Sequence, residues 1–273
     1  MILKSTFKIS SEGLYIRGQK YTDSLRMTTA VTFDGCYFQK CYISINPDTA
    51  FSHCFFQECG NGRYVCRNRN TVITDCLFEK SDGYIDTTNL NASHIRIFSS
   101  TFSTSCLQGN HVVFKDGNFT NNQGGKNILS YGTNTQIPLK FEHIIMAYNS
   151  AKDSIISISC NTEIDYSFIV NNNGTFIKSD SRSGDVNFII RNACIFVDKG
   201  SSLYNEQDVH IKGVHLINCS INMKSLPEKV EVIDVSYDTT KCKHVDCDQF
   251  TPIPERKYFD YKVIGEVNEK FAY

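Results

Sequence analysis

The segment Val31-Thr32-Phe33-Asp34-Gly35-Cys36-Tyr37-Phe38-Gln39-Lys40-Cys41 contains a pattern that the rest of the chain repeats. The pattern returns as Phe51-Ser52-His53-Cys54-Phe55-Phe56-Gln57-Glu58-Cys59 and as Ile73-Thr74-Asp75-Cys76-Leu77-Phe78. Counted from Phe33, apolar or small residues stand at positions 0, +3, +5 and +8. Self-similarity of this kind is the signature of a repeat architecture.

Ten segments fit this spacing between Phe33 and Val232. These two residues are 199 positions apart, which over nine steps gives about 22 residues per coil. That length suits three short strands and three turns, and it is shorter than helical repeats of about 33–47 residues. β-Branched and aromatic residues fill the repeats, which favours strands. The sequence therefore predicts an all-β protein, a right-handed parallel β-helix solenoid of about ten coils.

The register places one apolar residue of each coil at position 0 and a second at position +5. Position 0 is assigned to Phe33, Phe51, Ile73, Ile97, Phe114, Phe141, Ile164, Ile190, Ile211 and Val232. Position +5 is assigned to Phe38, Phe56, Phe78, Phe102, Phe119, Met146, Ile169, Ile195, Leu216 and Tyr237. We expect the five phenylalanines at +5 to stack as one buried aromatic column.

Residues 1–30 and 241–273 lie outside the repeats. The open ends of a solenoid pair with other chains unless they are capped. We therefore expect an N-terminal cap over 1–30, the parallel β-helix over 31–240 and a C-terminal cap over 241–273.

A tight corner is expected between positions 0 and +3, because these two positions would face opposite sides of a straight strand. The residue at position +2 should then adopt a positive φ. Eight of the ten side chains there are Gly, Asp, Asn or His, the types that tolerate this conformation best. Position +2 is assigned to Gly35, His53, Asp75, Ser99, Asp116, His143, Tyr166, Asn192, Gly213 and Asp234.

Two further columns predict how the interior is filled. Asn122, Asn149 and Asn172 occupy +8 in consecutive coils, so we expect their amides to form a hydrogen-bonded ladder. Twelve cysteines are present, and many fall at +3 or +8. We expect them to be buried free thiols that act as small apolar side chains. Disulfides are the alternative, since stacked strands bring equivalent Cα atoms within bonding range.

Charge and hydropathy restrict the partners. The formal net charge is −1, so there is no basic surplus and no nucleic-acid partner is expected. No stretch approaches the roughly 18 apolar residues of a membrane helix, so no membrane span is expected. No apolar signal-peptide region follows Met1, which favours a cytoplasmic protein as one alternative.

The repeats with Cys and Phe resemble the β-helix repeat proteins of trichomonad parasites, a family similar to the polymorphic membrane proteins of bacteria. The resemblance rests on the segment Phe51–Cys59, on Phe188-Ile189-Ile190-Arg191-Asn192-Ala193-Cys194-Ile195-Phe196 and on Leu216-Ile217-Asn218-Cys219-Ser220. It covers about residues 31–240. It implies a surface or secreted β-helix used in adhesion or recognition.

One group of corner residues is a candidate site. Position +1 is charged in successive coils, where it holds Lys115, Glu142, Asp165, Arg191 and Lys212. Glu142 and Asp165 should lie side by side, near the roughly 5 Å spacing of retaining glycosidases, with His143 and Tyr166 next to them. They form either a paired-carboxylate catalytic site or an exposed charge ladder. In the ladder, which we favour, Lys115 and Arg191 neutralise the two acids and these bases are candidate binding residues together with Lys212.

Cys242, His244 and Cys247 are three potential zinc ligands close together in the chain. Their spacing is irregular, so a capping turn or a disulfide is the simpler interpretation, and no cofactor is expected. The sequence thus predicts a non-enzymatic recognition protein with a protein or glycan ligand. A carbohydrate-active β-helix enzyme and an intracellular scaffold are the two alternatives.

Overall fold

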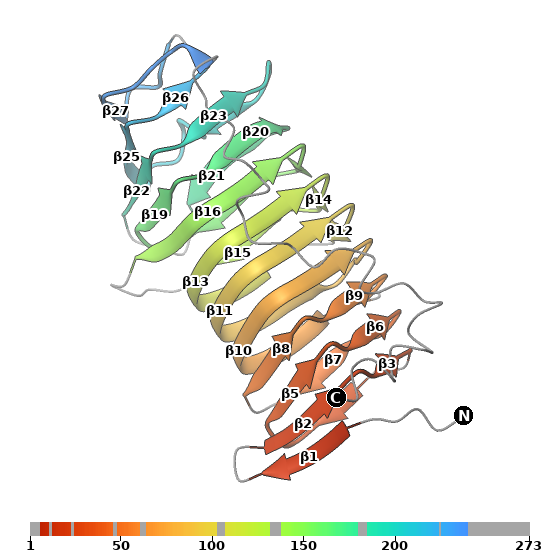
Figure 1. Cartoon of the computed structure of the whole chain (residues 1–273). Helices are drawn as coiled ribbons and strands as arrows, with labels where there is room; N and C mark the ends of the chain where they lie inside the picture. The colour runs from red at the N-terminus through yellow and green to blue at the C-terminus, as the bar shows by residue number, and fades with distance from the viewer. Residues whose placement is uncertain are drawn as a thin grey trace.

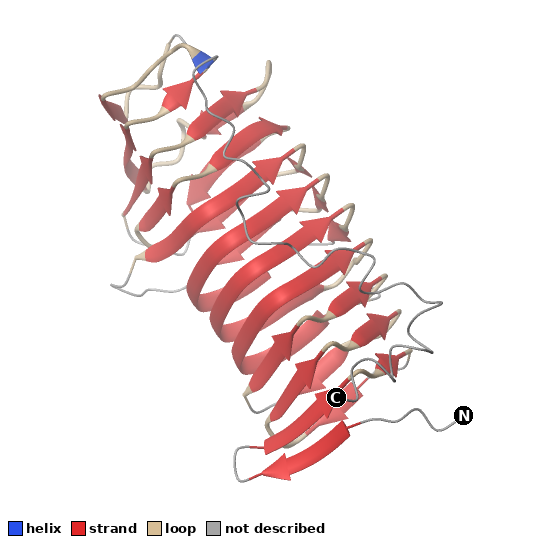
Figure 2. Ribbon diagram, viewed as in Figure 1, coloured by secondary structure: helices blue, strands red, loops and turns tan. Residues whose placement is uncertain are grey.

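The structure is a computed structural model that describes residues 6–10, 13–22, 25–45, 48–60, 64–102, 107–131, 138–179, 185–223 and 225–239. Strands make up most of the described residues, and helix is almost absent from them. The strands stack as a parallel β-solenoid with about 22 residues per turn (Figure 1). The predicted fold class is therefore confirmed. Figure 2 shows strands along the whole length of the solenoid.

Short strands build the coils at the N-terminal end, and long strands that bend through a corner build the middle. The N-terminal strands are β1 (Thr6–Ser10), β2 (Gly13–Arg17), β3 (Lys20–Tyr21), β4 (Leu25–Met27), β5 (Val31–Asp34), β6 (Tyr37–Gln39), β7 (Ile43–Ile45), β8 (Thr49–Ser52) and β9 (Phe55–Gln57). The middle strands are β10 (Tyr64–Glu79), β11 (Tyr84–Phe98), β12 (Thr101–Phe102), β13 (Leu107–Thr120), β14 (Gln123–Gly124), β15 (Asn127–Tyr131), β16 (Leu139–Ala147) and β17 (Ser150–Ala151).

The C-terminal coils again consist of short strands. These are β18 (Ser154–Ile158), β19 (Thr162–Asp165), β20 (Phe168–Asn172), β21 (Thr175–Ser179), β22 (Val186–Arg191), β23 (Cys194–Val197), β24 (Ser202–Tyr204), β25 (Ile211–Ile217), β26 (Ser220–Ile221) and β27 (Val230–Ile233). Strand β1 pairs antiparallel with β2, and β2 pairs parallel with β5 from Leu14 onward. Parallel stacking therefore begins before residue 31. The C-terminal cap expected over 241–273 lies outside the described residues.

The observed pairing fixes the residues at position 0. They are Ile16, Phe33, Phe51, Ile73, Ala92, Phe114, Phe141, Ile164, Ile190, Leu216 and Val232. Eight of the ten predicted assignments are confirmed. Ile97 and Ile211 were assigned wrongly, because Ile97 pairs with Phe78 and Ile211 pairs with Val186. Both errors have one cause: another apolar residue follows each at a distance of five, which imitates the 0/+5 spacing.

The predicted aromatic column at +5 is confirmed for Phe38, Phe56 and Phe78. Ring centroids lie 4.7 Å apart between Phe38 and Phe56 and 4.4 Å apart between Phe56 and Phe78, in stacked geometry. Phe102 was wrongly placed in this column, where Ile97 stands between Phe78 and Phe119. Phe102 is buried, but it pairs with Gly124 in the separate sheet of β12, β14 and β17.

The predicted corner is present in every coil from Ile16 to Val232. A positive φ at position +2 is found at Gly18, Gly35, His53, Asp75, His94, Asp116, His143, Tyr166, Asn192, Asn218 and Asp234. His94 and Asn218 replace the predicted Ser99 and Gly213, which follows from the two register errors. Ser99 does have a positive φ, but it belongs to a second corner at +7 with Lys40, Glu58, Lys80, Asn121, Tyr148 and Asn171.

The asparagine ladder at +8 is confirmed. The Asn122 amide donates to Asn149 Oδ1 at 3.1 Å, and the Asn149 amide donates to Asn172 Oδ1 at 3.0 Å. All three side chains are buried. Buried amides are stable here because each finds a partner one coil away.

The cysteines are of two kinds. Seven described cysteines are free and buried: Cys36, Cys41, Cys54, Cys59, Cys76, Cys160 and Cys219. Burial, the main cause, raises the pKa values of the Cys36 and Cys54 thiols well above the usual range. The prediction of free thiols is thus confirmed for these seven cysteines. It is wrong for Cys194, which is disulfide-bonded.

Candidate functional site

The +2 corner carries alternating aspartates and histidines through the N-terminal half of the solenoid. We call Asp34, His53, Asp75, His94, Asp116 and His143 the corner row. Asp34 stands at position +1 of its coil, and the other five stand at position +2 with positive φ. The left-handed conformation turns the chain sharply at this point, and parallel stacking then places equivalent residues of successive coils about 4.8 Å apart.

Each central histidine lies between two carboxylates. His53 Nδ1 is 3.0 Å from Asp34 Oδ1, and its Nε2 is 3.7 Å from Asp75 Oδ2. His94 Nδ1 is 3.5 Å from Asp75 Oδ1, and its Nε2 is 3.2 Å from Asp116 Oδ2. A column of aspartates alone would set like charges side by side, so the intervening imidazoles remove a repulsion that stacking would otherwise create.

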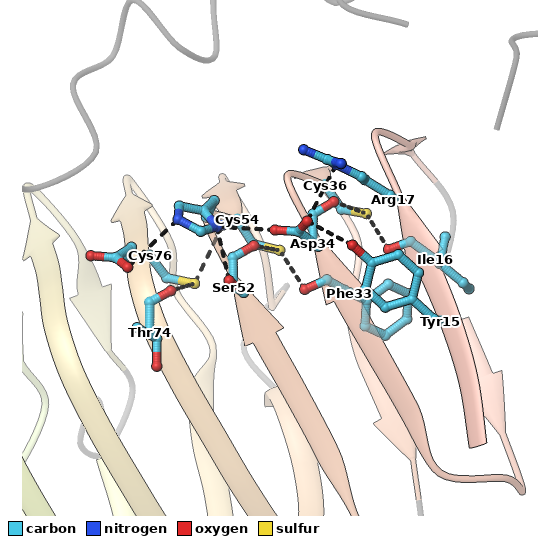
Figure 3. A network of polar contacts seen from close by, with 12 residues as sticks. Tyr15, Ile16, Arg17, Phe33, Asp34, Cys36, Ser52, Cys54, Thr74 and Cys76 are labelled. Carbon is cyan, nitrogen blue, oxygen red and sulfur yellow. Dashed lines mark hydrogen bonds and ion pairs between the residues drawn. The ribbon is translucent and has the colours of Figure 1, made fainter. Parts of the chain in front are cut away.

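Other groups complete both ends of the row. Figure 3 shows Tyr15, Arg17 and Asp34 gathered at the N-terminal end. The Tyr15 hydroxyl donates to Asp34 Oδ2 at 2.8 Å, and Arg17 Nε lies 3.3 Å from the same oxygen. Burial, followed by this hydrogen bond, raises the pKa of Tyr15 to about 12. Tyr15 therefore remains a hydrogen-bond donor at physiological pH.

The C-terminal end of the row joins the acids that the sequence had singled out. His143 Nδ1 lies 3.3 Å from Asp116 Oδ1 and 3.8 Å from Glu142 Oε1. Glu142 also pairs with Lys115 at 3.6 Å. The His143 and Tyr166 rings are in contact, with centroids 5.3 Å apart.

Glu142 and Asp165 are neighbours in the strand register, as predicted. Asp165 accepts hydrogen bonds from the Asn192 amide at 2.8 Å and from the Tyr166 backbone N–H at 3.0 Å. Lys115 neutralises Glu142, whereas Arg191 directs its guanidinium to Glu163 at 3.5 Å. The two acids thus have separate partners.

Lys212 was wrongly assigned to this ladder. Ile217, not Lys212, follows Arg191 in the register. The Lys212 ammonium lies 3.4 Å from Asp185 instead. Lys212 was assigned to position +1 because Ile211 was taken as position 0 of this coil, which is in fact Leu216.

The row and its neighbours include the three residue types of a serine-hydrolase triad, but the geometry differs from that mechanism. Ser52 Oγ lies 2.8 Å from His53 Nδ1, and Asp34 Oδ1 contacts the same nitrogen at 3.0 Å. In a functional triad the nucleophile contacts Nε2 while the carboxylate holds Nδ1. Here Nε2 faces Asp75, so His53 is not positioned to relay a proton from Ser52.

The described part of the chain offers neither a metal cluster nor a membrane-spanning helix. Among the described residues, no group of three or more His, Cys, Asp and Glu side chains could hold a metal ion. Within that same portion, no helix is long and apolar enough to cross a membrane. The candidate ligands Cys242, His244 and Cys247 lie outside the described residues.

The sequence did not point to His94, the second of the three histidines in the row. His94 was missed because Ser99 had been placed at the corner of that coil. The segment Ala92-Ser93-His94-Ile95-Arg96-Ile97 satisfies the 0, +3 and +5 positions, but Ala92 gives a weaker apolar signal than Ile97. A search for recurring Asp and His at +2 would have detected the alternative register.

Comparison with known proteins gives no family or function for this arrangement of residues. No protein-family model matches the chain, and no curated protein matches it.

Proposed function

We propose that this chain is a non-catalytic recognition protein that binds another macromolecule through the corner row and its exposed neighbours. The observation that supports this most directly is the alternation of carboxylates and imidazoles over consecutive coils on the outside of the solenoid. This surface is partly open to solvent, since the side chain of His53 in the row is 61% exposed and Tyr166, next to the row, is 49% exposed.

A rigid scaffold makes such a row suitable for binding. The backbone corners are fixed by coil-to-coil hydrogen bonds, for example from the His53 N–H to the Thr74 carbonyl at 3.1 Å. Side chains held by their neighbours lose little conformational entropy when a ligand binds. The row offers carboxylate oxygens and ring nitrogens at the strand spacing, with tyrosine rings close by. Such a surface suits an elongated ligand rich in hydroxyl or amide groups, namely a glycan or an extended polypeptide.

The location of the protein is part of the proposal. The resemblance of the repeats to trichomonad β-helix repeat proteins supports a role in adhesion or recognition at a cell surface. The disulfide at Cys194 agrees with an oxidising compartment, where such bonds persist.

Binding can be tested with panels of immobilised polysaccharides and immobilised extended peptides. We expect the wild type to bind members of one panel. The substitutions His53→Asn and His94→Asn should weaken that binding at least tenfold, because asparagine tolerates the corner but cannot bridge two carboxylates. His215→Asn is the matched control, since His215 lies on β25 outside the row and contacts Glu231. Equal binding by all three variants and the wild type would refute the assignment of the row.

A carbohydrate-active enzyme is the second candidate, and the adjacency of Glu142 and Asp165 favours it. Turnover of a polysaccharide by the wild type, abolished in a Glu142→Gln, Asp165→Asn double variant, would establish this alternative. We expect no turnover, since each acid already has a partner of its own and lies on an outward corner. Glu142 is also ion-paired with the Lys115 ammonium at 3.6 Å, so it is not free to act on a ligand.

A further inference from the structure

Four segments of the chain match Asn-X-Ser/Thr, the acceptor sequence for N-linked glycosylation. Their asparagines are Asn91, Asn118, Asn173 and Asn218, and the hydroxyl residues two positions later are Ser93, Thr120, Thr175 and Ser220. An asparagine-rich chain produces such matches by chance, so the motif alone does not mark a site. The solenoid separates the four, because a glycan is bulky and its asparagine must stay at the surface when the chain folds.

Asn91 lies on an outward sheet face. It directly precedes position 0 of its coil on β11, which Figure 1 shows between β10 and β13, and its backbone pairs with Val72 and with Val113 on these strands. Ala92 at position 0 is buried in the core, so Asn91 and Ser93 on either side of it point outward. Asn91 is exposed, and its side chain has no hydrogen-bond partner among the described residues.

The neighbours of Asn91 offer apolar surface that a sugar can cover. Val72 is 45% exposed and Val113 is 57% exposed. They lie one strand spacing, about 4.8 Å, on either side of Asn91, so a sugar attached there reaches both. One face of a sugar ring carries mainly C–H groups, and its contact with the valines removes apolar surface from water.

Asn173 lies on a turn, next to Asn172 of the buried ladder. Strand alternation directs Asn172 inward and Asn173 outward, and Asn173 is exposed. Its backbone N–H donates to the Asn149 carbonyl at 2.8 Å, and Gly174 after it has a φ of 113°, which glycine adopts without strain. The backbone thus fixes the turn, while the Asn173 side chain has no partner within the described ranges and can carry a substituent.

Asn118 and Asn218 differ because neighbouring groups engage their side chains. The Thr120 hydroxyl donates to Asn118 Oδ1, and Asn118 is only partly exposed. It is in register with Ile145, which is 4% exposed, so little open surface adjoins it. The Asn218 amide donates to Asn192 Oδ1 at 2.7 Å, and a glycan would replace a hydrogen on that same nitrogen.

We propose that Asn91 and Asn173 carry N-linked glycans and that Asn118 and Asn218 do not. This rests on the cell-surface location in the proposed function, because the sugar donor is met during export. The donor is an oligosaccharide joined to a lipid through a diphosphate. The asparagine Nδ2 forms a bond to C1 of the first sugar and loses one proton. The bond from C1 to the phosphate oxygen breaks, and the lipid diphosphate leaves with that electron pair.

Transfer to Asn91 precedes stacking of the coils. In the folded protein the backbone around Asn91 is paired on both sides, with β10 and with β13, so this segment cannot enter an enzyme's active site. The folded structure therefore decides only whether the modified side chain is accommodated. An outward side chain on an open sheet face meets that condition.

The first test uses the full wild-type chain isolated from the cells that naturally produce it. Trypsin places the four acceptor segments in four different peptides, 81–96, 116–126, 153–178 and 213–224. An N-glycosidase in heavy-oxygen water converts each glycan-bearing asparagine to isotope-labelled aspartate, which mass spectrometry distinguishes from spontaneous deamidation. We expect label at Asn91 and Asn173. Either of these without label, or label at Asn118 or Asn218, would overturn the proposal.

The second test removes single acceptor hydroxyls in the same cells and leaves each asparagine in place. Ser93→Ala and Thr175→Ala should each lose the mass of one glycan on a denaturing gel. Thr120→Ala is the matched control and should migrate as the wild type does. Wild-type migration of Ser93→Ala or Thr175→Ala would count against that site.

The glycan result and the binding result are separable. Wild-type binding by His53→Asn and His94→Asn would refute the row as a binding site and leave the label at Asn91 unaffected. Conversely, weakened binding by these two variants, together with no label at Asn91 and Asn173, would overturn the glycans alone.

Discussion

Replacement of Asn149 by alanine tests whether the buried amide ladder holds the solenoid together. The Asn149 amide donates to the Phe119 carbonyl at 2.8 Å and to Asn172 Oδ1 at 3.0 Å. Its Oδ1 accepts from the backbone N–H of Asn122 at 3.0 Å and from the Asn122 amide at 3.1 Å. The side chain therefore joins three successive coils through four hydrogen bonds.

The expected cost follows from these bonds. Each buried hydrogen bond contributes about 1 kcal/mol net, and each group left without a partner costs about 1–3 kcal/mol. Asn149→Ala removes all four bonds. It leaves two donors of Asn122, the backbone N–H and one amide N–H, without these partners. The backbone N–H of Asn149 keeps its bond to Asn172 Oδ1. The two terms describe the same lost contacts and are not added, so we expect the free energy of unfolding to fall by about 3–5 kcal/mol, a large part of the roughly 5–15 kcal/mol typical of a domain.

Urea unfolding followed by far-UV circular dichroism measures this change. Repeat solenoids need not unfold in a single step, so hydrogen exchange in β13, β16 and β20 should be measured alongside. Asn91→Ala is the matched control, because Asn91 is exposed on β11. Its effect should stay within about 0.5 kcal/mol.

Asn149→Asp gives an independent check with a defined pH dependence. An ionised carboxylate at this position would face the Phe119 carbonyl and Asn172 Oδ1, both acceptors, so the pKa of the new group would be raised in the folded state. The penalty should be small below the unfolded pKa of about 3.9 and should grow as the pH rises above it. Equal stability of Asn149→Ala and Asn91→Ala, or a pH-independent Asn149→Asp, would refute the ladder as a stabilising element.

Three further predictions concern the core, the thiols and the corner. Phe78→Ala should lower the free energy of unfolding by about 3–5 kcal/mol, because it opens a gap beside Phe56 in the stacked column, and a loss below about 1 kcal/mol in urea unfolding would contradict this. Cys36 and Cys54 should resist a thiol reagent in the folded protein at pH 8 and react once the protein is unfolded in urea, because burial raises their pKa values; equal labelling rates in the two states would show the thiols to be accessible. Tyr166→Gly should be more stable than Tyr166→Ala by about 1 kcal/mol in the same unfolding assay, because residue 166 has a φ of 47°, and the reverse order would count against a left-handed corner.

Part of the candidate site could be predicted from the sequence. Glu142, Asp165, His143 and Tyr166 were expected together at the corner, and the structure brings them together. The partners of the two acids could not be predicted, because they depend on the directions that long, exposed side chains take at the surface. Arg191 illustrates this, since it lies in register with Asp165 but pairs with Glu163.

Features that repeat within one coil follow from the sequence alone. The 0, +3, +5 and +8 spacing encodes strand direction, the left-handed corner and the inward slots, since these depend on residues only a few positions apart. For that reason the parallel solenoid, the first part of the aromatic column and the asparagine ladder were all predicted correctly.

Which side chains of different coils lie together depends on the tertiary structure. The coils differ in length, so that the step from Leu216 to Val232 is much shorter than the step from Phe114 to Phe141. Ile97 with Phe102 fits the local spacing as well as Ala92 with Ile97 does, and only pairing with Phe78 and Phe119 distinguishes them. The aspartate–histidine row is continuous only once that pairing is fixed, because His94 stands at position +2 only if Ala92, and not Ile97, is at position 0. Hydrogen bonds to the neighbouring coils make that choice, and residues a few positions apart cannot specify it.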